Sequence, residues 1–312
     1  QEIDRQPSST AALAEQSEIV WHNRLTAPIN RTMKELLAPT LENYKLSITH
    51  LNNFIDVTRG GPQNFLLNNL LRFPQAKSAN AIYGTLIHAV LQHAHSHLAA
   101  SGTRKPIEDI TGEFIRLLHQ QNLSDADLAF YSKRGIEALE AFLSAKYDTF
   151  KPSQKPELSF AGQGVVLGQA RLTGSLDLVD IDNQTITVTD YKTGKPSTSS
   201  TGKSDYEKIK LHKYRQQLMF YELLCANSRD YAKYDFGGAI LQFVEPDSRG
   251  DIYQLDDRFS RDELADFQRL IAAVWHCITT LELPDISSYQ ASYQGMIQFE
   301  KDLISSEYPA RE

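Results

Sequence analysis

The stretch GSLDLVDIDNQTITVTDYKTG, Gly174–Gly194, decides the fold of this 312-residue chain. Apolar and polar residues alternate on either side of a turn at 182–184, which predicts a β-hairpin. Because alternate residues of a strand share a face, Asp190 and Lys192 point the same way at the end of the second strand. Asp177 lies on the first strand, where pairing across the turn brings its carboxylate near that of Asp190. The hairpin therefore gathers two acids and a lysine.

Two carboxylates held close together repel each other unless a positive charge neutralises them. A divalent cation that prefers oxygen ligands does this, and Mg²⁺ is the usual choice. Lys192 beside such an ion would orient the attacking water and stabilise charge on a phosphate. The pattern thus indicates metal-assisted hydrolysis of a phosphodiester. An ordinary surface ion pair between Asp190 and Lys192 gives the same spacing, so the hypothesis needs partners from elsewhere in the chain.

A helix predicted over 79–100 supplies the first partner. Gly84 and His88 lie one turn apart on this helix, and the missing side chain of Gly84 allows another backbone to approach closely. An imidazole there would add a metal ligand to the carboxylates. From the helix alone, a satisfied and partly buried histidine is the favoured interpretation of His88.

A second helix, predicted over 205–226, carries Gln217 and Tyr221 four residues apart on one face. A glutamine beside an apolar stripe needs a partner, which a phosphate, a base, an active-site lysine or the protein backbone would provide. Glu157 begins the first extended segment, twenty residues before Asp177. It is either a further acid near the metal or a solvated strand end.

A basic stretch follows the hairpin directly. From Lys192 to Arg215 the chain has seven lysines and arginines, Lys195 among them, against two acids. The loop at 193–205 is flexible by composition. The stretch would follow a phosphate backbone, although such a charge run is usually only a solvated face.

Beyond the hairpin, helical and extended patterns alternate along the chain. Helices are predicted over 47–57, 79–100, parts of 108–148, 205–226 and, from a capping box at Ser260 and Glu263, through Leu281; further strands are predicted over 157–173, 237–245 and 251–255. This order predicts an α/β fold, with a central sheet covered by helices.

Residues 1–43 differ from the rest of the chain in composition. They are polar, and we expect a tail or linker with one short helix, NRTMKELL, before Pro39. Residues 44–312 then form one domain. The first residue is Gln rather than Met, so we expect the chain to be processed or cut from something longer.

Composition excludes several classes of protein. The formal net charge of −7 argues against a protein that coats nucleic acid by bulk charge. With only Cys225 and Cys277, the chain cannot form a disulfide framework or a four-cysteine metal site. A reducing, cytoplasmic location fits best. No apolar run is long enough to cross a bilayer, and we expect no membrane partner.

Five short motifs in order resemble the RecB-type nucleases of the PD-(D/E)XK superfamily, as in RecB, AddB and domains fused to UvrD-like helicases. They are LSITHLNNF at 46–54, YGTLIHAVL at 83–91, LTGSLDLVD at 172–180, DYKTG at 190–194 and QLMFY at 217–221. The resemblance spans about Leu46 to Cys225, and DYKTG is its most specific element.

This resemblance implies a restriction-endonuclease-like fold, with a mixed central sheet flanked by helices and with helical additions at both ends. It implies that His88, Asp177 and Asp190 hold Mg²⁺ or Mn²⁺ together with the Tyr191 carbonyl, and that Lys192 serves the water. The implied supporting residues beside the site and the DNA are Gln217, Tyr221, Lys195 and, less securely matched, Glu157.

The resemblance also implies an activity and partners. The chain would be an exonuclease-like DNA nuclease that cuts single strands or DNA ends in repair and recombination, coupled to a UvrD-like helicase region. The alternative is a catalytically inactive, DNA-binding or scaffold module of a helicase complex. Many relatives have Cys-Pro after the opening helix, where this chain has Gly61-Pro62, so we expect no iron–sulfur cluster.

Overall fold

The computed structural model describes residues 17, 18, 21, 32–196 and 202–306. Contacts within the chain divide it into two units, Gln1–Glu42 and Asn43–Glu312. The first unit contains α2, Met33–Glu42, which continues through Pro39 rather than ending before it. A proline inside a helix removes one backbone hydrogen bond but does not have to end the helix. Most of the expected tail lies outside the described residues.

The second unit holds the sheet and the remaining elements. In chain order they are α3 Ile48–Ile55, the 3₁₀ turn η1 Val57–Arg59, α4 Gly61–Phe65, the π-helix η2 Leu66–Leu70, α5 Ala79–Ser101, α6 Ile107–Leu118, α7 Asp125–Lys146, η3 Tyr147–Thr149, β1 Lys155–Ser159, β2 Val166–Leu167, β3 Ala170–Arg171, β4 Ser175–Asp182, β5 Thr185–Lys192, α8 Asp205–Ala226, β6 Asp235–Phe243, β7 Gln254–Asp257, α9 Arg261–Thr280 and α10 Tyr293–Ser305.

The central sheet is mixed and has the strand order β1-β4-β5-β6-β7. The predicted hairpin is β4–β5, which pairs antiparallel with Val179 opposite Val188. Strand β6 then lies parallel to β5, with Thr189 opposite Ile240, while β1 and β7 pair antiparallel at the edges. This sheet with its flanking helices is a restriction-endonuclease-like α/β fold, as predicted.

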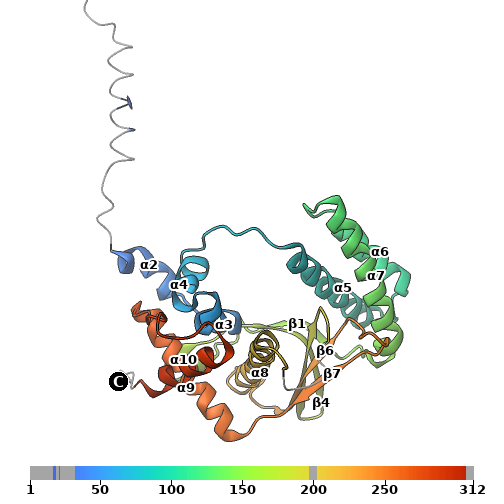
Figure 1. Cartoon of the computed structure of the whole chain (residues 1–312). Helices are drawn as coiled ribbons and strands as arrows, with labels where there is room; N and C mark the ends of the chain where they lie inside the picture. Colours follow the sequence, from blue (N-terminus) through green and yellow to red (C-terminus); the bar gives the residue numbers. More distant parts are fainter. Residues whose placement is uncertain (1–16, 19–20, 22–31, 197–201, 307–312) are drawn as a thin grey trace, which may run out of the picture. The chain divides into compact units, whose positions relative to one another are not determined.

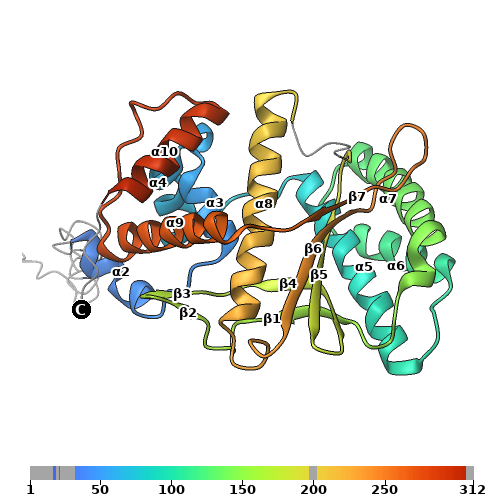
Figure 2. The ribbon, with the colours of Figure 1, turned by 90° about the horizontal axis from the view of Figure 1, so that it is seen from below.

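Helices cover both faces of the sheet. Neighbouring residues at the end of β5 point to opposite faces: the Asp190 carboxylate contacts α8, whereas the Tyr191 hydroxyl contacts His95 of α5. Helices α5, α6 and α7 form one group, and α3, α4, α9 and α10 form another, with α8 between them (Figures 1 and 2).

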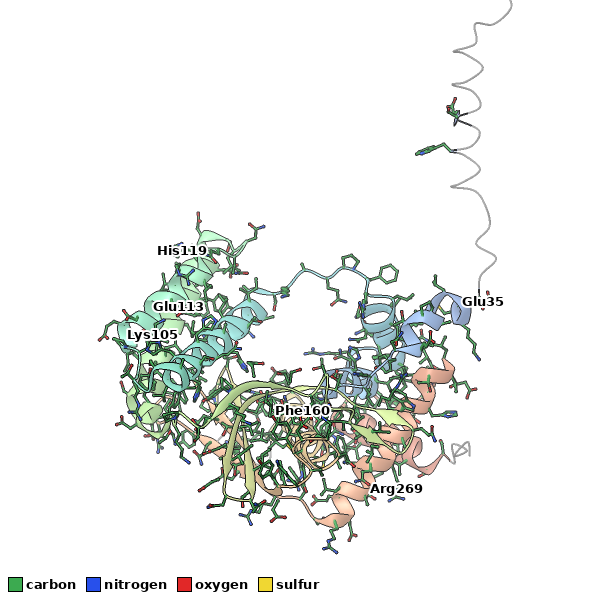
Figure 3. All side chains as sticks on the ribbon, turned by 180° about the vertical axis from the view of Figure 1, so that it is seen from behind. Glu35, Lys105, Glu113, His119, Phe160 and Arg269 are labelled. Atoms are coloured by element: carbon green, nitrogen blue, oxygen red, sulfur yellow. The ribbon has the colours of Figure 1, made fainter. Side chains whose placement is uncertain are left out.

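The two groups of helices are well separated in the side-chain view. Lys105, Glu113 and His119 lie on the group of α5–α7, and Arg269 lies on α9 on the other side (Figure 3). Phe160 lies between them, next to the sheet, and its side chain is fully buried.

Two predicted helices are confirmed in detail. The stripe on α5 is buried as its spacing indicates, from Tyr83 to Leu98. Helix α9 begins after the predicted capping box, in which the Ser260 hydroxyl accepts from the Glu263 amide and the Glu263 carboxylate accepts from the Ser260 amide.

The strand predicted over 251–255 begins later than expected. The Asp247 carboxylate accepts hydrogen bonds from the amides of Arg249 and Asp251, which holds this segment in a turn. Strand β7 therefore starts only at Gln254. We did not predict helix α10 from the sequence pattern. This helix follows its N-cap residue Ser292 and packs against α9.

In the described part of the chain, we find no helix with the length and apolar character that a membrane crossing requires.

Candidate active site

The end of the β4–β5 hairpin positions the first acid. The last ladder pair is Leu178 opposite Thr189, so Asp177 lies just beyond the regular pairing. Its Oδ2 accepts a hydrogen bond from the backbone amide of Tyr191 at 2.8 Å. This bond fixes the carboxylate against the DYK segment of β5.

Helix α5 brings His88 to the same carboxylate. His88 Nδ1 lies 3.2 Å from Asp177 Oδ2. The close approach expected at Gly84 is present, because a Cβ atom there would lie 3.1 Å from Thr193 Oγ1. Burial lowers the pKa of His88, but the hydrogen bond and charge of Asp177 outweigh burial, and the net shift is upward.

Glu157 reaches the site from the edge strand β1 by an unusual backbone conformation. Pro156 pairs with Leu178 and Leu158 with Leu176, which sets Glu157 opposite Asp177. Its φ angle is 48°, a left-handed value that is uncommon for non-glycine residues and that often occurs at functional sites. The Ser175 hydroxyl donates to its Oε2 at 3.0 Å. Burial and the Asp177 charge raise the pKa of Glu157.

Together these three residues form a candidate metal centre. One ligand atom each from His88, Glu157 and Asp177 lie within 4.8 Å of one another. An imidazole nitrogen and two carboxylate oxygens are ligands for divalent cations such as Mg²⁺ and Mn²⁺. The Asp177 carboxylate raises the pKa of His88 and, together with burial, raises that of Glu157.

Asp190 takes part in a different network on the face covered by α8. Its Oδ2 lies 2.7 Å from Lys192 Nζ. Its Oδ1 accepts from Gln217 Nε2 at 2.9 Å and from the Tyr221 hydroxyl at 2.8 Å. Burial and the nearby Asp177 carboxylate raise the pKa of Asp190, although Lys192 opposes the shift.

Lys192 is enclosed by groups that hold its ammonium in place. Its Nζ donates to Gln217 Oε1 at 2.6 Å and lies 4.4 Å from the centre of the Tyr214 ring. Such a cation–π contact stabilises a partly desolvated ammonium. Only 14% of the Lys192 side chain is exposed, so its position is well defined.

The structure places most of the predicted residues in two neighbouring groups. The candidate metal centre consists of His88, Asp177 and Glu157, the last of which was expected either as a further acid near the metal or as a solvated strand end. The adjoining network consists of Asp190, Lys192, Gln217 and Tyr221, in which Gln217 has Lys192 and Asp190 as partners. Tyr191 lies between Asp190 and Lys192 in the chain, and its backbone amide donates to Asp177.

The basic stretch is less free than its composition indicates. Lys213 pairs with Asp56, and Arg215 pairs with Asp257 and Glu263. Lys195 is exposed just beyond β5, and its carbonyl accepts from Lys210 Nζ at 3.5 Å. The middle of the loop, residues 197–201, lies outside the described residues.

Sequence reasoning missed Glu245 and Arg134, which hold the end of the DYKTG segment. Glu245 Oε1 accepts from the Gly194 amide at 2.6 Å and from Arg134 Nη2 at 2.8 Å. Glu245 lies just beyond β6, and the carboxyl ends of parallel strands meet at one sheet edge. To predict that Glu245 lies near Gly194, one would need to know that β5 pairs with β6, and the sequence does not specify this pairing.

Gly61, the first residue of α4, occupies the position at which many relatives have a cysteine. Gly61 has a φ angle of 45°, and a Cβ atom there would lie 3.2 Å from Ile286 Cδ1 and 3.3 Å from the Phe54 carbonyl oxygen. The segment after α9 therefore packs directly against this turn.

A comparison with protein-family models identifies a matching superfamily. The model described as the PD-(D/E)XK nuclease superfamily matches residues 45–290. The match extends beyond the five motifs and includes β6, β7 and α9. A search of curated proteins found no match.

Proposed function

This chain belongs to the PD-(D/E)XK nuclease superfamily, and on that premise we propose that it is a divalent-metal-dependent nuclease that hydrolyses phosphodiester bonds of DNA. The observation that carries the proposal is the adjacency of two groups. The ligand set of His88, Glu157 and Asp177 adjoins Lys192, a partly buried lysine held by Asp190 and Gln217.

Each group has a separate part in the proposed chemistry. A bound Mg²⁺ or Mn²⁺ would supply Lewis acidity at a phosphate oxygen and lower the pKa of a water. We propose His88, Glu157 and Asp177 as side-chain ligands, with Asp190 and the Tyr191 carbonyl completing the set as the motif resemblance implies. Lys192 would orient the attacking water and stabilise the negative charge that develops on the phosphate. Gln217 and Tyr221 would hold Asp190 and Lys192 in place.

The test uses labelled single-stranded DNA with Mg²⁺, with and without EDTA. The wild-type chain should cleave only when the metal is free. The Asp177→Ala and Asp190→Ala variants should each lose nearly all activity while they keep the wild-type circular dichroism spectrum. Asp182→Asn, an exposed acid at the end of β4, is the matched control and should cleave normally. Undiminished cleavage by a folded Asp190→Ala protein would refute the site.

Finer features of the function rest on the motif resemblance to RecB-type nucleases. We propose that the substrates are single strands or DNA ends, that cleavage is exonucleolytic, and that the chain acts in DNA repair or recombination with a UvrD-like helicase region. We further propose a cytoplasmic location, no iron–sulfur cluster, and that residues 44–312 form the nuclease domain after a linker. Cleavage of duplex DNA with and without such a motor and ATP tests the coupling, and iron analysis tests the cluster.

A further inference from the structure

A polar pocket lies apart from the catalytic network, beside the opening helices. Its volume is about 310 Å³, at the lower end of the range of small-molecule sites. Five side-chain amides line it, those of Asn53, Asn64, Asn68, Asn69 and Gln75. Phe73 lines it too and is 58% exposed, unusually open for a phenylalanine.

The amides of this pocket are only partly satisfied by one another. Asn53 Nδ2 donates to Asn69 Oδ1 at 3.2 Å, Asn68 donates to Asn64, and Gln75 donates to Asn68. Each amide carries two N–H donors and an acceptor oxygen with two lone pairs. Among the hydrogen bonds of the described residues, the oxygens of Asn53 and Gln75 and the amino groups of Asn64 and Asn69 have no partner. The pocket therefore offers donors and acceptors together.

The backbone around the pocket is irregular in two places. Asn68 and Asn69 lie in the π-helix η2, where the Leu71 amide donates to the Leu66 carbonyl. Arg72 follows with a φ angle of 55°. Such π-helical turns and left-handed non-glycine residues are found preferentially at functional sites. Both irregularities lie within the segment that contributes Asn68, Asn69 and Phe73 to the pocket lining.

The lining selects for one chemical class of ligand. An apolar ligand would leave the amides unpaired, at a cost for each group. A phosphate would find only Arg59, which lies 3.7 Å from the carboxylate of Asp56. A nucleobase fits better, because its edge carries donors and acceptors that match asparagine and glutamine, and its face stacks on an aromatic ring.

Helix α8 connects this pocket with the catalytic network. Lys213 pairs with the pocket residue Asp56, and Gln217 bonds to Lys192. The two α8 residues are four apart and lie on one face, with about 5–6 Å between their Cβ atoms. The segment that carries Phe73 and Gln75 runs between the two groups of helices, from η2 to α5 (Figure 1).

From these observations we propose that the amide pocket with Phe73 binds one unstacked base of the single strand whose phosphodiester bond is cut beside Lys192. This proposal rests on the proposed function and adds to it a base-binding subsite at a fixed distance along the strand. The subsite acts in binding and register, and it takes no part in the bond-breaking step.

The first test maps the contact without cleavage. Single-stranded DNA with one 5-iodouracil is bound to the full chain in EDTA, irradiated and digested with trypsin. We expect the crosslink in the peptide 73–77, and at one position of the strand. Crosslinks confined to other peptides, or no single-strand binding at all, would overturn the proposal.

The second test is a coupling cycle between protein and DNA. Fluorescence anisotropy in EDTA compares wild type and Phe73→Ala on oligonucleotides with an abasic site moved one position at a time. Loss of stacking should weaken wild-type binding on the order of 10-fold at one position, and Phe73→Ala should lose that sensitivity. Phe130→Ala is the matched control, because Phe130 is 59% exposed on α7 and does not line the pocket.

The two proposals fail in distinguishable ways. If the nuclease proposal is wrong, Mg²⁺ produces no cleavage whether or not Phe73 couples to a base. If the subsite proposal is wrong, Mg²⁺-dependent cleavage is observed, but Phe73→Ala does not change the effect of an abasic site on binding at any position of the strand. Asn68→Asp gives an independent check, since a carboxylate in place of the amide should weaken binding at the same strand position as Phe73→Ala.

Discussion

Gln217 bonds to Lys192 and Asp190 at once, with its Oε1 2.6 Å from Lys192 Nζ and its Nε2 2.9 Å from Asp190 Oδ1. The amide is suited to this place because one end accepts and the other donates. It fixes the ammonium of Lys192 without cancelling its charge. Lys192 is thus positioned by a neutral neighbour, Gln217, as well as by Asp190, the acid that balances its charge.

Lys192 should act on chemistry more than on binding. Lys192→Ala should reduce turnover on the order of 10²-fold, as loss of other electrostatic groups does, while affinity for DNA in EDTA stays close to wild type. Single-turnover kinetics and anisotropy measure the two quantities separately. Lys151→Ala, which removes a lysine paired with Asp180 on β4, is the control. A variant that loses affinity alone would make Lys192 a phosphate contact.

Glu157 should contribute directly to metal affinity. Its ligand atom lies within 4.8 Å of those of His88 and Asp177. Glu157→Gln should weaken Mn²⁺ binding on the order of 10- to 100-fold or more, measured by calorimetry in the absence of DNA. Glu140→Gln changes an exposed glutamate on α7 and should bind the metal as wild type does. Equal affinities for both variants would place Glu157 outside the metal centre.

The contact of Gly84 with Thr193 should be sensitive to any side chain. Gly84→Val would push α5 away from the end of β5, because even a Cβ atom lies 3.1 Å from Thr193 Oγ1. His88 would then move from Asp177, and activity should fall at least about 10-fold. Gly112→Val makes the same change on α6, where a Cβ meets nothing within 4 Å, and should leave cleavage unchanged. Similar losses in both variants would point to helix propensity rather than to this contact.

His95 should make the fold sensitive to acid. Burial lowers the pKa of His95 to about 4, and its ring bonds to the Tyr191 hydroxyl at 2.8 Å and stacks on Phe150. As the pH falls, the unfolded chain protonates this histidine at about pH 6.5, whereas the folded chain protonates it only at a lower pH. The free energy of unfolding should therefore fall by up to about 3 kcal/mol as the pH drops from about 6.5 to 4.

Urea unfolding of wild type and His95→Gln at several pH values measures this contribution. Carboxylates add to the acid sensitivity of both proteins, so the difference between the two curves isolates the histidine. The wild type should lose more stability than the variant between pH 6.5 and 4. Parallel curves would show that His95 takes up its proton equally in both states.

Local sequence patterns predicted the parts of this fold that depend on neighbours in the chain. The hairpin, the α5 stripe and the box at Ser260 and Glu263 all follow from spacing over a few residues. The parallel pairing of β6 with β5 depends on contacts between distant segments, and so does the arrival of Glu245 at Gly194. Spacing carries no signal for such contacts.

The candidate site shows the same division. Asp190, Lys192, Gln217 and Tyr221 were predicted from two local motifs, and the structure brings them together. Glu157 could not be placed from the sequence because its side chain reaches Asp177 only through a left-handed backbone turn within β1. Alternation along an ordinary strand would not have predicted that conformation.

The left-handed backbone of Glu157 lowers the stability of the fold, whereas its carboxylate is expected to serve activity. Any residue with a Cβ atom costs roughly 1–2 kcal/mol in this region, whereas glycine adopts it readily. A search for thermostable variants that ignored catalysis would therefore favour glycine at this position and remove a carboxylate from the metal centre. Directed evolution of this chain for heat resistance should be screened for cleavage at every round, since one such stabilising change lies inside the candidate site.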